Sequence, residues 1–113
     1  MLRDFFLGFI KIHILHHAAH EPVFGLALIR ELARHGYDVS PGTVYPILHE
    51  LERSGYLRRE DRVVQGKVRK YYHTTPFGDQ ALEEARAKIA ELVAEVLRGE
   101  GPSSLTDEEL PTA

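Results

Sequence analysis

The sequence predicts a mainly α-helical chain with one small β-hairpin and a further helix near its C-terminal end. Three observations support this fold class. Residues 40–55 encode a short capped helix, two strand-like runs joined at a glycine follow it, and a long amphipathic stretch begins at Pro76. A helix followed directly by a basic hairpin is typical of a winged helix-turn-helix, here with an additional C-terminal dimerisation helix.

Length and composition limit the class of protein. The 113 residues suit one domain with a small core, and the absence of cysteine excludes disulfides and thiolate metal sites. No stretch approaches the roughly 18 apolar residues of a membrane span, and no signal-peptide cleavage site is evident. We therefore expect a cytoplasmic protein without membrane contact. The net charge of −3 divides into 0 for residues 1–27, +3 for residues 28–73 and −6 for residues 74–113, so overall acidity does not exclude nucleic acid.

The first helix is expected over residues 2–19 and is apolar almost all the way round. Such a helix must be covered on two sides. One side is expected to pack on the helix-turn-helix, and the other, with Phe5 and Phe9, to meet a second subunit.

Four histidines lie in the second half of this helix: His13, His16, His17 and His20. At 100° per residue they fall within an arc of about 100°, and two pairs have the i, i+4 spacing that lets two imidazoles bind one ion. One interpretation is a Zn²⁺, Ni²⁺ or Cu²⁺ site completed by Glu21 or by another subunit. The plainer interpretation is a solvated helix end where the negative pole favours histidine. No cofactor is otherwise expected.

The second helix is expected over Phe24–His35, after a break at residues 21–23, with Gly36 as its C′ residue and residues 36–39 as the turn of the helix-turn-helix. The third helix has clear start and stop signals. The Ser40 hydroxyl can cap its first turn, a proline follows at the first helical position, and Gly55 can close the helix in the left-handed conformation.

The third helix has an apolar stripe on one face and hydrogen-bonding side chains on the other: Thr43, Tyr45, His49, Glu52 and Arg53. Such donors and acceptors suit base edges, and free N–H groups at the helix start suit a phosphate. Pro46 has no N–H to donate a hydrogen bond to the Gly42 carbonyl, so a bent first turn is expected. An ordinary amphipathic helix is the plainer interpretation.

The hairpin is expected over residues 56–73, with its turn at Gln65-Gly66. Six of its residues are basic: Arg58, Arg59, Arg62, Lys67, Arg69 and Lys70. Phosphate contacts position a protein on DNA and make its affinity depend on salt, so this charge favours a DNA-backbone contact. The alternative is a solvated hairpin in which Glu60 and Asp61 neutralise their neighbouring arginines. Of two successive tyrosines, Tyr71 and Tyr72, one is expected to pack inward.

The last helix is expected to run from Pro76 to about Leu97. Its apolar residues are spaced 3, 4, 3 and 4 apart and form a short coiled-coil seam: Leu82, Ala85, Ile89, Leu92 and Val96. This seam is expected to pack on the first helix of a second subunit, although packing within one subunit is the alternative. The expected organisation is therefore a winged helix-turn-helix over residues 1–74, a dimerisation helix over residues 75–98 and a disordered acidic tail over residues 99–113.

Four segments carry a family resemblance: Ser-Pro-Gly-Thr-Val-Tyr-Pro-Ile-Leu-His-Glu-Leu-Glu at residues 40–52, Gly-Tyr-Leu at 55–57, Arg-Lys-Tyr-Tyr at 69–72 and Thr-Pro-Phe-Gly at 75–78. Through these segments the chain resembles the PadR family of transcriptional regulators, and the resemblance extends from about Phe5 to about Leu97. Because one helix follows the hairpin, the chain resembles the short branch of that family. The resemblance implies a homodimer, most simply a repressor, that binds an inverted repeat in double-stranded DNA and responds to an effector.

The expected DNA contacts are Ser40, Thr43, Tyr45, Pro46 and His49 in the third helix and Lys67, Arg69, Lys70 and Tyr71 in the hairpin. The expected effector is a small ligand, or a divalent metal at the histidine cluster. One competing hypothesis is a winged helix that binds a protein without specific DNA binding. A metal-dependent hydrolase is disfavoured because the sequence contains no nucleophile motif and no carboxylate placed as a base, so no enzyme is expected.

Overall fold

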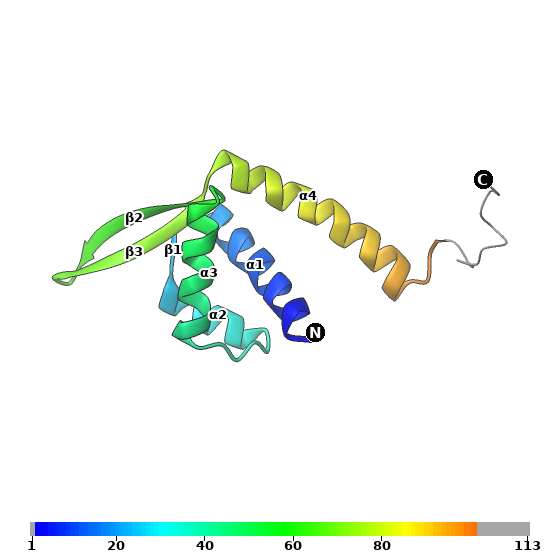
Figure 1. The fold of residues 1–113 in the computed structure, drawn as a ribbon, viewed down its shortest axis with the longest axis horizontal. Helices are drawn as coiled ribbons and strands as arrows, with labels where there is room; N and C mark the ends of the chain where they lie inside the picture. Colours follow the sequence, from blue (N-terminus) through cyan, green and yellow to red (C-terminus); the bar gives the residue numbers. More distant parts are fainter. Residues whose placement is uncertain (1, 102–113) are drawn as a thin grey trace.

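The computed structural model describes residues 2–101 and contains four α-helices and a small sheet (Figure 1). The elements are α1 (Leu2–His20), β1 (Val23–Phe24), α2 (Gly25–Arg34), α3 (Pro41–Arg53), β2 (Leu57–Val64), β3 (Lys67–Thr74), α4 (Pro76–Leu92) and a π-helical turn (Val93–Leu97). Helices α1 to α3 form a central body, the β2–β3 hairpin projects from one side, and α4 projects from the other. The fold class predicted from the sequence is confirmed. The expected acidic tail lies outside the described residues from residue 102 onward.

Glycine closes both helices of the helix-turn-helix, as the sequence predicts. Gly36 after α2 has φ +87° and Gly55 after α3 has φ +86°, a conformation that side chains with a Cβ rarely adopt. In each case the N–H of the glycine and the N–H of the next residue bond back to carbonyls of the last helical turn. These reverse turns set the directions in which the chain leaves α2 and α3.

The start of α3 differs from the expectation in one bond. Ser40 occupies the N-cap position, but its hydroxyl makes no capping hydrogen bond. Its main-chain carbonyl instead accepts from the N–H groups of Thr43 and Val44, at 3.0 and 3.1 Å. Helix α3 then continues without a break past Pro46.

The sheet has three strands, in the order β1-β3-β2, where the sequence predicted only a hairpin. Strand β1 pairs antiparallel with β3, with Val23 opposite Tyr72 and Phe24 opposite Tyr71. Phe24 was expected inside the second helix. Its backbone is extended because it pairs with β3, so α2 begins one residue later, at Gly25.

One hydrophobic core joins the four helices to the base of the hairpin. Its buried residues are Ile10, Ile14, Leu15, Ala18, Leu28, Leu32, Val44, Ile47, Leu48, Leu51, Leu57, Tyr72 and Leu82. Of the tyrosine pair in β3, Tyr72 is the one that packs inward, and Tyr71 is only partly covered. None of the helices in residues 2–101 is long and apolar enough to cross a membrane.

Helix α4 starts in a corner formed by the end of α3 and the start of β2. The Thr75 hydroxyl accepts from the Gly78 N–H at 3.0 Å and donates to the Gly55 carbonyl, so one side chain joins the two helix ends. Gly78 and Leu82 are buried there. The regular α-helix ends at Leu92, and the π-helical turn that follows ends at Leu97, close to the predicted end of the helix.

Candidate nucleic-acid interface

The solvent-facing side of α3 is narrower than its polar pattern suggests. Four exposed residues, Gly42, Pro46, His49 and Arg53, are spaced 4, 3 and 4 apart and therefore lie along one line of the helix. Pro46 and His49 belong to the set predicted to contact DNA. Gly42 and Arg53 do not belong to that set. Gly42 lies seven residues before His49 and Arg53 four residues after it, spacings that place all three on the same face of a helix.

The other predicted contacts of α3 lie at its edges. Ser40 is exposed just before the first turn. Thr43 is half-buried and lines a hollow that also includes Phe6 of α1 and Tyr37 of the turn. The hydroxyl of Thr43 is therefore not on the line that carries His49.

Tyr45 connects α3 to the start of α2. A Cβ atom added at Gly25 would lie 2.6 Å from the Tyr45 ring, which shows that the ring rests directly on the glycine backbone. The same ring lines a hollow of about 300 Å³ with Phe24 and with Arg69 of β3. Tyr45 therefore packs between α2, α3 and the hairpin, and only part of it is accessible.

The arginines of β2 are largely neutralised by its own acids. Arg62 donates to Glu60 at 3.2 Å, and Arg59 lies 3.4 Å from Asp61. The hydrogen bond from Arg62 and the charge of Arg62 hold the pKa of Glu60 below its ordinary value. Arg58 contacts His73 at 3.2 Å. The alternative interpretation of the hairpin, in which Glu60 and Asp61 neutralise neighbouring arginines, therefore describes Arg59 and Arg62 of this strand.

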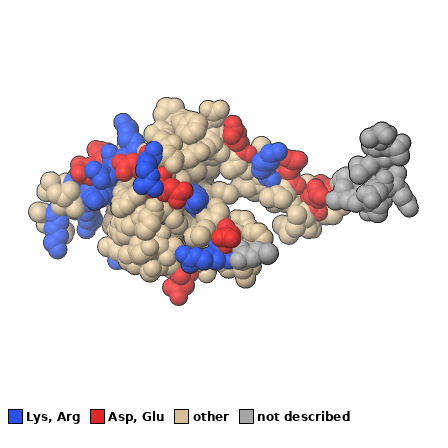
Figure 2. Space-filling model, viewed as in Figure 1, with Lys and Arg blue, Asp and Glu red and all other residues tan. Residues whose placement is uncertain are grey.

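The basic residues of β3 are different. Within residues 2–101, Lys67, Arg69 and Lys70 have no acidic group within 4.0 Å. Lys67 and Lys70 are exposed, and the Arg69 guanidinium lies over the Phe24 ring, 4.9 Å from its centre. Figure 2 shows basic side chains gathered over the hairpin. Three of the four basic hairpin residues without an acidic partner among the described residues are therefore on β3, and the fourth is Arg58 on β2. Arg69 and Lys70 line one hollow with Tyr45 of α3.

Tyr71, the last predicted DNA contact, lies in an aromatic and basic group on one face of the sheet. The Arg62 guanidinium lies over its ring at 4.5 Å, and the Phe24 ring centre is 5.5 Å away. These contacts hold the hairpin against β1, which leads directly into α2.

The predicted dimerisation residues fall into two groups. Phe5, Phe9, Ile89, Leu92 and Val96 are exposed, with Phe9 at 51% and Leu92 at 58%. Leu82, in contrast, is only 3% exposed because α1 and the rest of the core cover it, and Ala85 is half-buried. The seam is therefore divided, because its first turn packs within the chain and its later turns are open.

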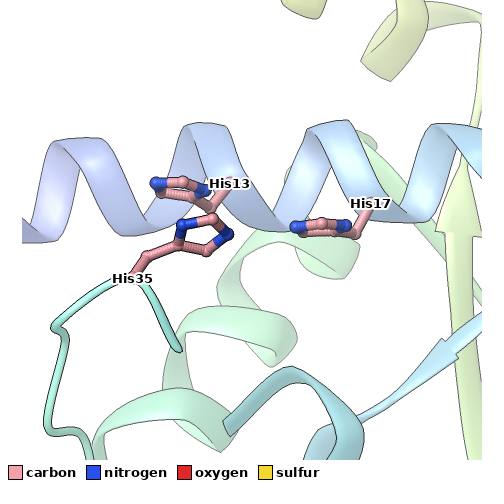
Figure 3. Close-up of side chains that lie close together, drawn as sticks. All are labelled: His13, His17 and His35. Carbon is pink, nitrogen blue, oxygen red and sulfur yellow. The ribbon is translucent and has the colours of Figure 1, made fainter. Parts of the chain in front are cut away.

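The histidines form a different cluster from the one predicted. His13, His17 and His35 each offer a ring nitrogen, and these three atoms lie within 4.8 Å of one another (Figure 3). His13 and His17 come from α1, and His35 comes from the C-terminal end of α2. His16 and His20 are not in this group, and His20 Nδ1 lies 2.9 Å from the His16 carbonyl. His35 was absent from the prediction because only the packing of α2 on α1 brings it there.

A carboxylate adjoins the cluster. Glu31 Oε1 lies 3.1 Å from His35 Nε2 and 3.8 Å from His17 Nε2, while Oε2 accepts from Arg34. Desolvation acts to raise the pKa of Glu31, but the His35 hydrogen bond and the Arg34 charge outweigh it, so the pKa is lowered. Desolvation, followed by the nearby charges of His35 and His17, lowers the pKa of His13. The site therefore places His13, whose pKa is lowered, near the negative charge of Glu31.

A helix-turn-helix, a basic wing beside its second helix and a projecting helix with exposed apolar residues define a DNA-binding transcriptional regulator. The profile of the PadR-like transcriptional regulator family matches residues 14–84, and the chain belongs to this family. The sequence-based resemblance is thus confirmed. The members of this family are regulators that bind DNA and typically dimerise; they are not enzymes.

Individual relatives agree with the family match. The chain is 52% identical over 99 residues to the transcriptional regulator Rv3488 of Mycobacterium tuberculosis H37Rv, covering 88% of this chain and 92% of the relative. A PadR family regulator from Eggerthella lenta has a similar crystal structure, with a TM-score of 0.75, 34% identity and 87% of each chain covered. A PadR-like transcription factor from Bacteroides fragilis has a TM-score of 0.74 at 29% identity, covering 87% of this chain and 96% of that one.

Proposed function

We propose that the protein is a homodimeric repressor that binds an inverted-repeat operator and whose affinity is modulated by a small ligand or a divalent metal. One observation carries the DNA-binding part of this proposal. Arg69 and Lys70 of β3, which have no acidic group within 4.0 Å in the described part of the chain, line one hollow with Tyr45 of α3, so that phosphate contacts can adjoin the base-reading helix.

In this proposal α3 lies in the major groove and β3 follows the DNA backbone. His49 and Arg53 are the side chains on the exposed line that can bond to base edges, and Arg is the most frequent reader of guanine. Gly42 and Pro46 leave the first turn without long side chains, which allows close approach to DNA. Lys67, Arg69 and Lys70 contact phosphates. Two copies place two such surfaces on half-sites about one helical turn apart.

The exposed apolar residues of α1 and α4 support a dimer. Phe5 and Phe9 on α1, Leu92 at the end of α4 and Val96 in the π-helical turn that follows are large side chains that one chain leaves in water. Covering them with a second copy stabilises the assembly by roughly 25 cal/mol for each Å² buried. The DNA-binding unit in this proposal is residues 1–74, and the dimerisation part of α4 begins after Leu82.

Changing Phe9 and Leu92 together to Glu is expected to convert the dimer to a monomer at micromolar concentration. Two buried carboxylates on each chain would have to lose water without a partner. Sedimentation velocity measures the change. The control is Leu26→Glu, which places the same charge on an exposed leucine of α2 and is expected to leave the dimer intact. A dimer that persists in the double variant would place the interface elsewhere.

The proposed function is tested by titrating the protein against the DNA upstream of its own coding region, over a series of salt concentrations. Binding is expected to be about a thousandfold tighter than to a scrambled duplex and to fall steeply with salt. Equal affinity for both duplexes and a shallow salt dependence would contradict the proposal. That result would favour a winged helix that binds a protein instead.

A further inference from the structure

We propose that His13, His17 and His35 bind one Zn²⁺ ion and that Glu31 positions two of the three imidazoles. The site links α1 to the C-terminal end of α2. It therefore differs from a site confined to α1, which the spacing of His16 and His20 also allows. Its existence does not depend on DNA binding, whereas its regulatory consequence rests on the proposed function.

The three rings are close to the geometry that the ion requires. With Zn–N distances of about 2.0–2.1 Å, tetrahedral ligand atoms lie about 3.4 Å apart. The three nitrogens now lie within 4.8 Å, so side-chain rotations that close at most about 1.5 Å complete the set. The His13 and His35 rings are already stacked, with centres 5.0 Å apart. His17 lies one turn further along α1, as Figure 3 shows.

Glu31 holds two of these rings in place. Its Oε1 atom faces Nε2 of both His35 and His17, while Arg34 binds its other oxygen and limits rotation of the carboxylate. A carboxylate next to a metal-bound imidazole fixes the ring and raises its basicity. The charge of Glu31 also offsets part of the charge that the ion brings. Glu31 is therefore a positioning residue.

The donor set selects the class of ion. Three imidazoles without any thiolate suit Zn²⁺ and related transition metals, whereas Mg²⁺ and Ca²⁺ require oxygen ligands. An i, i+4 pair on one helix and a third ligand from another element can surround the ion from different directions, which fits the tetrahedral preference of Zn²⁺. The exposed position of His35, whose side chain is 46% accessible, gives the ion a path to the site.

The position of the site in the fold predicts its consequence. His35 directly precedes Gly36, where the chain turns toward α3, and α1 carries the exposed Phe5 and Phe9. A bound ion therefore fixes the angle between the proposed dimer surface and the DNA-reading helix. In a dimer this angle sets the separation of the two α3 helices, so Zn²⁺ is expected to change operator affinity by at least about tenfold.

Isothermal titration of Zn²⁺ into the metal-free full-length protein tests the site. We expect one ion per chain, and a rise in Tm of about 10 °C at a free Zn²⁺ concentration of about a hundred times Kd. His35→Ala is expected to weaken binding by more than about 100-fold, and Glu31→Gln by roughly 10–100-fold. The control, His16→Ala with His20→Ala, removes two histidines of the same helix and is expected to bind like the wild type. Circular dichroism verifies that each variant is folded.

Three results would overturn the site: no stoichiometric binding to the wild type, undiminished binding to His35→Ala, or loss of binding in the His16/His20 double variant alone. Operator binding with and without Zn²⁺ tests the coupling separately. If the protein binds Zn²⁺ through the three histidines but binds no operator, the metal site stands and the proposed function fails. If operator affinity is the same with and without Zn²⁺, the coupling is overturned.

Discussion

Changing Lys67, Arg69 and Lys70 together to Ala is expected to lower operator affinity by about a thousandfold and to flatten its dependence on salt. Each chain loses three phosphate contacts, so a dimer loses six. Because the slope of log K against log salt changes by about 0.9 for each phosphate contact, it should fall by about 5. Binding titrations of wild type and variant over the same salt series measure both quantities.

The structure supplies a charge-matched control for this variant. Arg86, Lys88 and Arg98 are exposed on α4 and the turn that follows it, so changing all three to Ala alters net charge equally without touching the hairpin. This control should keep the wild-type slope. A second variant, with only Lys67 and Lys70 changed, leaves Arg69 on Phe24 and should give about two thirds of the slope change. Equal slopes for hairpin and control variants would contradict the assignment of phosphate contacts to β3.

Gly78→Ala is expected to lower the free energy of unfolding by about 3 kcal/mol. A Cβ at this position would lie 2.0 Å from the Tyr56 carbonyl oxygen, a main-chain atom that also accepts from the Thr75 N–H. The oxygen cannot move aside without breaking that bond, so α4 must shift away from the corner between α3 and β2. Denaturant unfolding at one fixed protein concentration measures the loss.

Gly42→Ala is the matched control. Gly42 and Gly78 both lie in the first turn of a helix whose first residue is a proline. A Cβ at Gly42 would meet only the Ser40 hydroxyl, at an ordinary 3.6 Å. Its unfolding free energy should stay within about 0.5 kcal/mol of wild type. If both variants were equally stable, the close contact at Tyr56 would not matter to the fold.

Much of the fold could be predicted because its signals are local. Gly36 and Gly55 mark helix ends because glycine readily adopts the left-handed conformation found there. Pro76 marks a helix start because its fixed φ angle suits the first helical position. The pattern of the hairpin residues likewise indicated two strands and their turn. Strand β1 could not be predicted, because two residues show no periodicity and Val23 and Phe24 are extended only through their pairing with β3.

The candidate site was harder to predict. Residues that occupy equivalent positions in the sequence pattern differ in exposure and contacts once the helices pack together. His35 lies 18 residues beyond His17 in the sequence, and no spacing rule connects them. Conversely, the polar face of α3 included Tyr45, which the structure packs against Gly25. Leu82 fitted the heptad spacing of the exposed seam, yet it belongs to the core of its own chain. The roles proposed for the DNA-contacting residues stay predictions.

The end of α4 and the π-helical turn after it determine how hydrogen exchange at backbone amides depends on protein concentration. Leu92, Val96 and Leu97 are exposed in the single chain, so no apolar packing protects the amide hydrogens there. Short helical segments are marginally stable in water. Deuterium should therefore replace these amide hydrogens quickly in dilute protein and slowly once two copies cover the segment, while the rate at Leu48 in the core follows global unfolding. Hydrogen exchange measured at several protein concentrations thus shows which residues become protected when two copies associate.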